Sequence, residues 1–127
     1  MKNINLHTKN NILIDEFLNI FSDLEYFRQT YYERYHNLFC DDTTITDKNF
    51  VGKGQDDIRK YFFGYDPRIL YVIKNQFRYV DSEIAMAFVS ISEEGGLARD
   101  FIRLRNLCLN ATFSNDKILH INFFSQD

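Results

Sequence analysis

A histidine and two asparagines in the C-terminal part of the chain carry side chains that could do chemistry. His120 lies in an apolar run that predicts a strand, and Asn122 follows at the same parity, so both side chains point to one face of that strand. A histidine in a pocket can act as a general acid or base, and a carboxamide both donates and accepts hydrogen bonds. Asn106 falls at a break in another strand pattern, where it could point its carboxamide into a cavity. The alternatives are a partly exposed strand histidine and an asparagine that only satisfies the local backbone.

Tyrosines cluster between residues 26 and 35. Tyr31 and Tyr35 belong to an apolar stripe at helical spacing, which usually indicates a core-facing helix side. The hydroxyls of Tyr32 and Tyr35 would still be available to a ligand if this helix borders a cavity. The sequence contains no HExxH, EF-hand or phosphate-loop pattern, so we expect no metal and no nucleotide cofactor.

The first half of the chain must supply helices that position these side chains. The apolar spacing predicts one helix around residues 14–21, a second over 24–39 capped by Asp23, and a third opening at Gly54. We expect a turn over Cys40–Thr43 and a short strand over Thr43–Thr46.

The second half predicts four antiparallel strands, over residues 69–80, 84–92, 101–113 and 118–124, joined by tight turns. Helices followed by strands indicate an α+β domain. In the third of these strands, the apolar positions change parity between Leu104 and Leu107. A β-bulge near Arg105–Asn106 would repair this change and bend the sheet. We interpret Arg103 and Arg105 as part of a solvent-exposed or dimer-forming face.

Composition narrows the classes of function. The 127 residues fit one domain, with 45% hydrophobic and 26% charged residues, as in globular proteins. A net charge of −3 argues against nucleic acid and against an anionic membrane surface. No apolar run approaches the ~18 residues of a membrane span. Residues 1–10 predict a flexible polar tail without a signal peptide, and Cys40 and Cys108 predict two free thiols in the cytoplasm.

Four segments, in order, carry a resemblance to known proteins. Phe39–Asp47 is similar to an F-A-D-D-A-x-x-x-D stretch, and Gly54–Phe62 to a G-x-x-A-I-R-x-F-F helix. Asp81–Ile84 and Asn115–Ile118 are similar to the turns x-G-D-x-V and D-G-K-I. Together they resemble the nuclear transport factor 2-like superfamily, which includes SnoaL-like polyketide cyclases and ketosteroid isomerases. This resemblance implies a cystatin-like α+β cone, with three N-terminal helices packed in a strongly curved, mixed, mainly antiparallel sheet.

The resemblance also suggests a catalytic residue. Asp47 falls where ketosteroid isomerases hold their general-base aspartate, and a carboxylate at the rim of an apolar cavity can accept a proton near neutral pH. The alternative is a loop aspartate that caps a turn. The family's oxyanion-binding acid would fall near Leu109, which cannot donate a hydrogen bond, and its first-helix tyrosine would fall near Asp15–Phe17.

Two uses of such a fold remain open. In the first, the chain is a cofactor-free cyclase, isomerase or dehydratase for an apolar carbonyl compound. Asp47 and His120 would then be the catalytic residues: Asp47 would move the proton, and His120 would stabilise the oxyanion together with Tyr32 and Asn106. The remaining ligand-binding candidates are Tyr35, Asn122 and Phe62.

In the second use, the chain is a non-catalytic ligand-binding or protein-interaction domain. A pocket filled by the chain's own Phe and Tyr side chains would favour this use. In either case we expect a homodimer through the outer face of the sheet, because the strands between 69 and 124 carry more apolar residues than one buried face needs.

Overall fold

A computed structural model describes residues 6–66, 68–95 and 102–125 of the chain. The helical elements come first, interrupted only by two short strands. They are α1 (Leu6–Asn19), η1 (Ile20–Ser22), α2 (Leu24–Thr30), η2 (Tyr31–Tyr35), η3 (His36–Leu38) and α3 (Gln55–Phe63). The strands are β1 (Phe39–Asp47), β2 (Phe50–Lys53), β3 (Ile69–Val80), β4 (Ile84–Gly95), β5 (Ile102–Ser114) and β6 (Lys117–Ser125).

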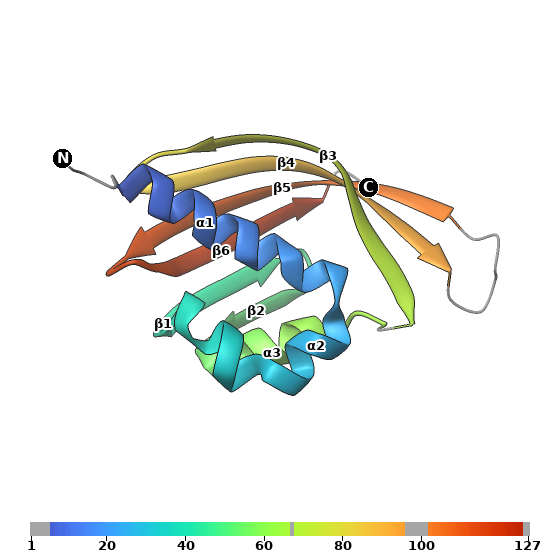
Figure 1. Ribbon diagram of the computed structural model, residues 1–127, viewed down its shortest axis with the longest axis horizontal. Coiled ribbons are helices and arrows are strands. Elements are labelled where there is room, and N and C mark those ends of the chain that lie inside the picture. The colour runs from blue at the N-terminus through green and yellow to red at the C-terminus, as the bar shows by residue number, and fades with distance from the viewer. Residues whose placement is uncertain (1–5, 67, 96–101, 126–127) are drawn as a thin grey trace.

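The strands form one six-stranded sheet in the order β2-β1-β6-β5-β4-β3. The predicted antiparallel meander runs from β3 to β6. The hairpin of β1 and β2 joins it through a parallel pairing of β1 with β6. The sheet curves around α1, which crosses its concave side, and α2 and α3 lie at the lower end (Figure 1). This architecture confirms the predicted α+β cone with a mixed, mainly antiparallel sheet.

The predicted second helix consists of three pieces. Asp23 caps α2 as expected, because its carboxylate accepts a hydrogen bond from the backbone N–H of Tyr26 at 3.0 Å. After Thr30 the chain forms a π-helical turn, η2, and then a 3₁₀ turn, η3. The apolar stripe survives these changes, since Leu24, Phe27 and Tyr31 are all buried.

Two local predictions are corrected at the ends of the helices. The turn expected over Cys40–Thr43 is wrong, because these residues belong to β1. The Thr43 hydroxyl accepts from the Cys40 N–H at 2.7 Å and donates to the Ile118 carbonyl at 2.6 Å, across an irregular part of the β1–β6 pairing. The predicted tail is already helical from Leu6, and Asn10 is buried with its amide on the Asp81 carbonyl at 2.9 Å.

The β-bulge predicted near Arg105–Asn106 is also wrong. The pairing of β4 with β5 runs without a shift from Ile84↔Thr112 to Glu94↔Ile102. Strand parity therefore stays constant, so Leu104 points to the outer face and is 58% exposed, while Arg105 shares the concave face with Leu107. The irregularities of the meander lie instead between Ile73 and Asn75 and between Thr112 and Phe113.

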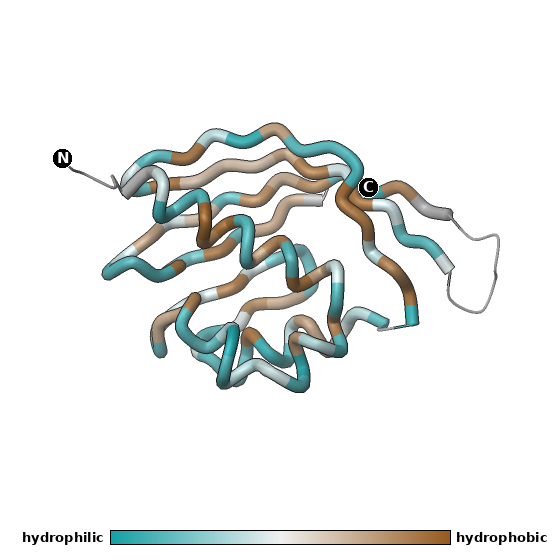
Figure 2. Tube along the Cα trace, in the orientation of Figure 1, coloured by the Kyte–Doolittle hydropathy of each residue, from teal (hydrophilic) through white to brown (hydrophobic). Residues whose placement is uncertain are grey.

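Aromatic side chains fill the interior of the cone. Phe17 of α1 contacts Phe21, Phe39, Phe62 and Phe123, with ring centroids 5.8–6.5 Å apart. The middle of the sheet is mostly apolar, whereas hydrophilic residues gather in α2, α3 and the turns (Figure 2). The space between helices and sheet is thus largely a packed core.

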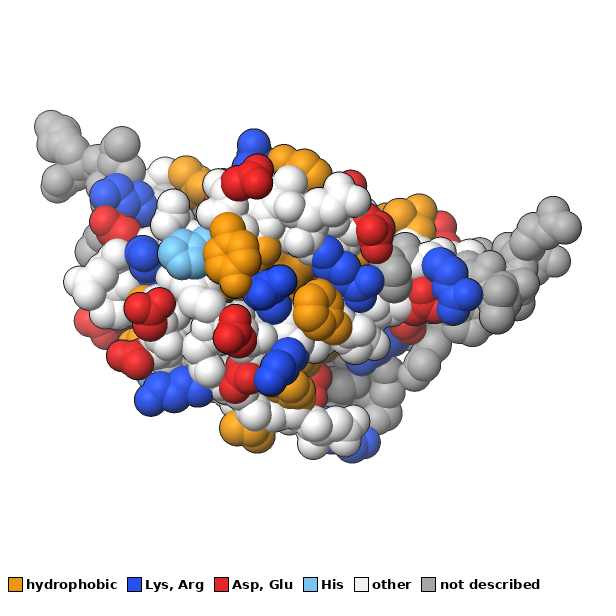
Figure 3. All heavy atoms as spheres, turned by 90° about the horizontal axis from the view of Figure 1, so that it is seen from below, with side chains coloured by type: hydrophobic (Ala, Val, Ile, Leu, Met, Phe, Trp, Pro, Cys, Tyr) orange, Lys and Arg blue, Asp and Glu red, His pale blue; other side chains and the backbone are white. Residues whose placement is uncertain are grey.

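The outer face of the sheet differs from the helical face in charge. Cross-strand pairing places two outward rows side by side: Tyr79-Met86-Asn110-Asn122-Thr46-Val51 and Phe77-Phe88-Cys108-Phe124. Neither row contains an Asp, Glu, Lys or Arg. By contrast, the face seen from below, over α2 and α3, intersperses charges of both signs with separate hydrophobic side chains (Figure 3).

Candidate functional site

One pocket lies where α3, the turn between β1 and β2, and the inner face of the sheet meet. It has a volume of about 360 Å³, and we call it the mouth pocket. Its walls include Asp47, Phe50, Tyr61, Tyr65, Glu93 and Arg105. Ligand pockets in proteins typically have volumes of ~300–1,000 Å³, and the mouth pocket falls in this range. Its lining combines four aromatic side chains with the charged side chains of Asp47, Lys60, Glu93 and Arg105.

Asp47 and Tyr61 form the polar centre of this pocket. The Tyr61 hydroxyl donates a hydrogen bond to Oδ2 of Asp47 at 2.8 Å. Oδ1 of Asp47 accepts from the backbone N–H of Asn49 at 2.8 Å, which fixes the carboxylate at the end of β1. Burial raises the pKa of the Tyr61 hydroxyl, and the neighbouring Tyr65 and Asp47 add to the rise. Tyr61 therefore remains a protonated hydrogen-bond donor at neutral pH.

Tyr65 extends the polar centre toward the sheet. Its hydroxyl oxygen lies 3.0 Å from that of Tyr61, one helical turn earlier. Burial raises the pKa of Tyr65, while the Tyr61 hydroxyl and Arg105 act in the opposite direction. If Tyr61 donates to Asp47, then Tyr65 donates to Tyr61, and the hydroxyl hydrogens of both tyrosines point toward the carboxylate.

Arg105 and Glu93 close the pocket on the sheet side. Nη1 of Arg105 lies 3.9 Å from Oε1 of Glu93 on the neighbouring strand. The Glu93 side chain is 10% exposed and that of Arg105 26% exposed, so the guanidinium is the more accessible partner. The pocket thus has a carboxylate at one end, an ion pair at the other, and two hydroxyls between them.

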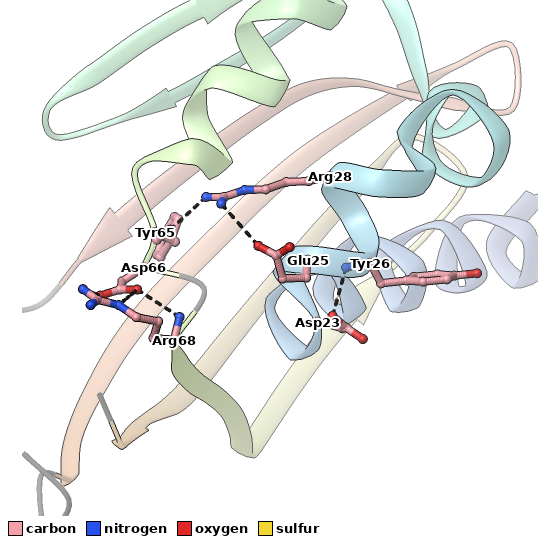
Figure 4. A network of polar contacts seen from close by, with 7 residues as sticks. All are labelled: Asp23, Glu25, Tyr26, Arg28, Tyr65, Asp66 and Arg68. Atoms are coloured by element: carbon pink, nitrogen blue, oxygen red, sulfur yellow. Dashed lines mark hydrogen bonds and ion pairs between the residues drawn. The ribbon is translucent and has the colours of Figure 1, made fainter. Parts of the chain in front are cut away.

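Arg28 supports the loop that carries Tyr65. Its Nη2 donates to the Tyr65 carbonyl at 3.2 Å, and its Nη1 pairs with Glu25 at 3.6 Å (Figure 4). In the same loop, Asp66 accepts from the backbone and side chain of Arg68 at 2.9–3.0 Å. These contacts tie α2 to the segment between α3 and β3, so the Tyr65 backbone is held from outside the pocket.

The predicted strand residues lie on the outer face of the sheet. His120 is exposed, and its Nδ1 lies 2.7 Å from the Thr44 hydroxyl. Asn106 accepts a hydrogen bond from Ser90 at 2.7 Å on this outer face. Asn122 borders a 190 Å³ hollow with His120, and a separate groove of about 360 Å³ with Asp47 and Phe124. The structure thus brings Asn122 near Asp47 from outside and does not bring His120 or Asn106 into the mouth pocket.

The predicted aromatic residues also lie away from the mouth pocket. Tyr32 is 62% exposed on the helical surface, where its hydroxyl accepts from Arg59 at 3.0 Å. Tyr35 packs against Tyr26 and Phe27. Phe62 is fully buried in the aromatic core, so a ligand could reach it only by displacing other side chains.

Of the six residues named above as walls of the mouth pocket, only Asp47 was predicted as a site residue, and the other five were not. Tyr61 belongs to the apolar face of α3, Tyr65 follows Gly64, and Glu93 was expected in a turn. For Arg105 a signal does exist in the sequence. The parity change in β5 marks a charged side chain on the concave face, as an alternative to the bulge that we expected.

Two features do not occur in the part of the chain that the structure describes, a cluster of metal ligands and a membrane-spanning helix. Within residues 6–66, 68–95 and 102–125, no three His, Cys, Asp or Glu side chains gather as they would around a metal ion. Over the same ranges, none of the helices combines the length and the apolar character needed to cross a bilayer.

Comparisons with known proteins support the fold. An NTF2-like protein from Cytophaga hutchinsonii is 17% identical with a TM-score of 0.65, covering 95% of this chain and 99% of its own. A protein of ketosteroid isomerase-like fold from Catenulispora acidiphila, solved with trimethylamine, is 11% identical with a TM-score of 0.68, covering 87% and 82%. An LEH-like epoxide hydrolase of M. tuberculosis is 11% identical with a TM-score of 0.72, covering 96% and 86%.

Sequence comparison adds nothing to these structures, since no family model and no curated protein matches the chain. The structural neighbours, which include proteins named SnoaL-like, confirm the predicted resemblance at the level of the fold. The chain has the NTF2-like fold.

Proposed function

We propose that the chain binds a small apolar carbonyl compound in the mouth pocket and that Asp47 moves a proton on that compound. The observation that carries this proposal is the 2.8 Å hydrogen bond between the Tyr61 hydroxyl and the Asp47 carboxylate inside an aromatic-walled pocket. Isomerase, cyclase and dehydratase chemistry all begin with such a transfer. Structural neighbours named as isomerases, cyclases and an epoxide hydrolase support this class of function.

In the proposed reaction, Asp47 accepts a proton from the carbon next to the carbonyl group. The C–H bond breaks, and its electron pair moves into the carbonyl system to form an enolate. Once Asp47 carries the proton, the Tyr61 or Tyr65 hydroxyl can turn from the carboxyl group and donate a hydrogen bond to the enolate oxygen, which stabilises its charge. Asp47 then returns the proton to the same or a neighbouring carbon. Tyr61 and Tyr65 take the oxyanion-binding role that the sequence suggested for Tyr32, Asn106 and His120.

Exchange of carbon-bound hydrogen for deuterium tests the proposal without knowledge of the natural substrate. We expect the protein to accelerate α-proton exchange of cyclohexanone or 4-phenylcyclohexanone in D₂O, followed by proton NMR. Asp47→Asn should abolish the acceleration and leave binding of the same ketone intact. Asp56→Asn is the matched control, because Asp56 has an 82% exposed side chain on α3. An Asp47→Asn protein that exchanges at the wild-type rate would refute the role of Asp47.

A binding function without catalysis is the second candidate. It is favoured by the interior of the cone, which the rings of Phe17, Phe21, Phe27 and Phe62 fill. Under this candidate, wild-type protein binds the ketone without accelerating exchange, and Asp47→Asn binds it equally well. The same two measurements therefore separate the candidates.

We also propose that the outer face of the sheet forms a homodimer. Its two uncharged rows contrast with a chain in which 26% of residues are charged. Phe77 and Phe124 are 73% and 55% exposed there, and Phe88 lies between them. A contiguous uncharged face with protruding aromatic rings is typical of a surface that another protein covers, and twofold pairing of one face with itself needs no second kind of partner.

A further inference from the structure

Arg105 precedes three apolar side chains on the concave face of β5. Leu107, Leu109 and Ala111 follow it on the same concave face and are buried. Turning a guanidinium toward the interior of a cone costs free energy of desolvation, which an apolar residue would avoid. A position of this kind indicates a role that the fold alone does not require.

The ion pair with Glu93 accounts for the position of Arg105 but not for its function. The two side chains form a loose pair at 3.9 Å, and Glu93 is the more deeply buried partner. Both side chains line the mouth pocket, and their ion pair holds the guanidinium at its wall. A buried carboxylate that keeps an arginine turned into a pocket is a positioning group for that arginine.

We infer that Arg105 binds a carboxylate of the ligand, so that the pocket prefers small oxo acids over neutral ketones. This inference rests on the mouth pocket of the proposed function. A guanidinium presents N–H groups in a planar fork that matches the two oxygens of a carboxylate. The hydroxyls of Tyr61 and Tyr65 line the same pocket as the guanidinium. The rings of Phe50 and Tyr71 line it too and can contact the apolar part of the ligand.

The charges of the pocket also fix the orientation of such a ligand. Asp47 stands at the opposite end from Arg105 and repels an anionic group. The carboxylate of the ligand therefore lies toward Arg105, and the carbon that loses its proton lies toward Asp47. Lys60 is the second cation at the pocket, with a side chain that is 68% exposed and paired with Asp57 at 3.9 Å. Because Lys60 is at the rim, we assign the carboxylate to Arg105.

The test compares two matched probes, 4-oxocyclohexanecarboxylate and its carboxamide, by NMR titration of the full chain. We expect wild-type protein to bind the carboxylate at least tenfold more tightly, with a preference that weakens as salt is added. Arg105→Gln should bring the ratio of the two affinities close to one, and Arg105→Lys should retain part of it. Arg68→Gln, which changes an exposed arginine paired with Asp66, should keep the wild-type ratio.

Loss of Arg105 removes one partner of the buried Glu93 carboxylate, which can destabilise the fold. The double variant Glu93→Gln/Arg105→Gln removes both charges and should also lose the preference. Glu93→Gln alone keeps the guanidinium and should keep the preference. Equal binding of the two probes by wild-type protein would overturn the inference, as would a preference that survives in the folded double variant or disappears in Lys60→Gln alone.

The outcome is independent of the proton transfer. Asp47→Asn removes a negative charge from the pocket and should bind the carboxylate at least as tightly as wild type. A protein that prefers the carboxylate but exchanges no α-protons would confirm the role of Arg105 and refute the proposed catalysis. A protein that binds both probes equally well and exchanges their α-protons would support the proposed catalysis and refute the role of Arg105.

Discussion

The ring of Phe123 lies parallel to the ring of Tyr61, with centroids 5.5 Å apart and an interplanar angle of 7°. Phe123 belongs to β6 and also stacks on Phe17 of α1 at 5.8 Å. One core residue thus connects the sheet, the first helix and the tyrosine that contacts Asp47. The aromatic core supports the mouth pocket directly, because the position of the Tyr61 hydroxyl depends on the surface beneath its ring.

Replacing Phe123 by Ala should destabilise the protein by about 3–5 kcal/mol, the usual cost of removing a buried phenylalanine ring. Chemical denaturation followed by circular dichroism measures this loss. Phe63→Ala is the control, since Phe63 is 48% exposed and contacts Arg28 and Arg59 by cation–π interactions worth about 1 kcal/mol or less. Similar losses in the two variants would contradict the supporting role of Phe123.

Replacing Tyr61 by Phe removes the hydroxyl and keeps the ring. If Tyr61 stabilises the enolate, the rate of α-proton exchange should fall by about 10²–10³-fold, as when other enzymes lose one oxyanion-binding donor. NMR-detected exchange in D₂O gives this rate. Tyr71→Phe is the matched control, because Tyr71 lines the same pocket, whereas the hydroxyl that donates to Asp47 belongs to Tyr61. A larger effect from Tyr71→Phe than from Tyr61→Phe would exclude Tyr61 as the donor.

Stability should fall steeply at alkaline pH. Burial raises the pKa values of Tyr31, Tyr61 and Tyr65 above 10, whereas the same hydroxyls ionise near pH 10 in the unfolded chain. The folded state then binds more protons than the unfolded state, so the stabilisation is complete below pH 10 and is lost as pH rises above it. Each such tyrosine adds about 1.4 kcal/mol per pH unit to the slope.

Urea unfolding at several pH values between 9 and 11 measures that slope. In Tyr61→Phe, the unfolding free energy should fall less steeply with pH, by the equivalent of about one proton, because one of the buried hydroxyls is gone. An unchanged slope in the Phe variant would show that Tyr61 titrates alike in both states. The two proteins differ only at residue 61, so the contributions of all other groups cancel in the comparison.

Replacing Phe88 by Glu should produce a monomer. Phe88 lies in the middle of the outer face, between Phe77 and Cys108, so a twofold dimer would bring two new carboxylates into an apolar interface. Light scattering at micromolar concentration should give twice the chain mass for wild type and the single mass for the variant. Phe63→Glu on the helical face should remain a dimer, and a monomeric wild type would refute the proposed interface.

The elements that the sequence predicted well are those in which apolar periodicity decides the structure. Ile14, Phe17 and Leu18 recur at helical spacing and are all buried. The β3 strand has the bounds that were predicted, and the turn at Asn115–Asp116 is present with positive φ angles of 54° and 64°. Burial of one face is the dominant favourable term for such segments, so their pattern is sufficient to identify them.

The candidate site was harder to predict because it depends on register and on contacts between distant segments. Asp47 could be proposed from its neighbours in sequence, but its partner Tyr61 is 14 residues away on another element. His120 and Asn122 share a parity as expected, yet pairing of β6 with β1 and β5 places that parity on the outer face. A one-residue change of register would reverse both assignments, and no local signal fixes it.

The aromatic filling of the cone leaves the reactive groups close to bulk solvent. Asn49 and Lys60 at the rim are exposed, so water can approach Asp47 between turnovers. An intermediate that water destroys would not survive in so shallow a site. Such an arrangement suits reactions in which water is harmless, released or consumed. It also favours ligands with one ring over flat, multi-ring compounds, which need a deeper cavity.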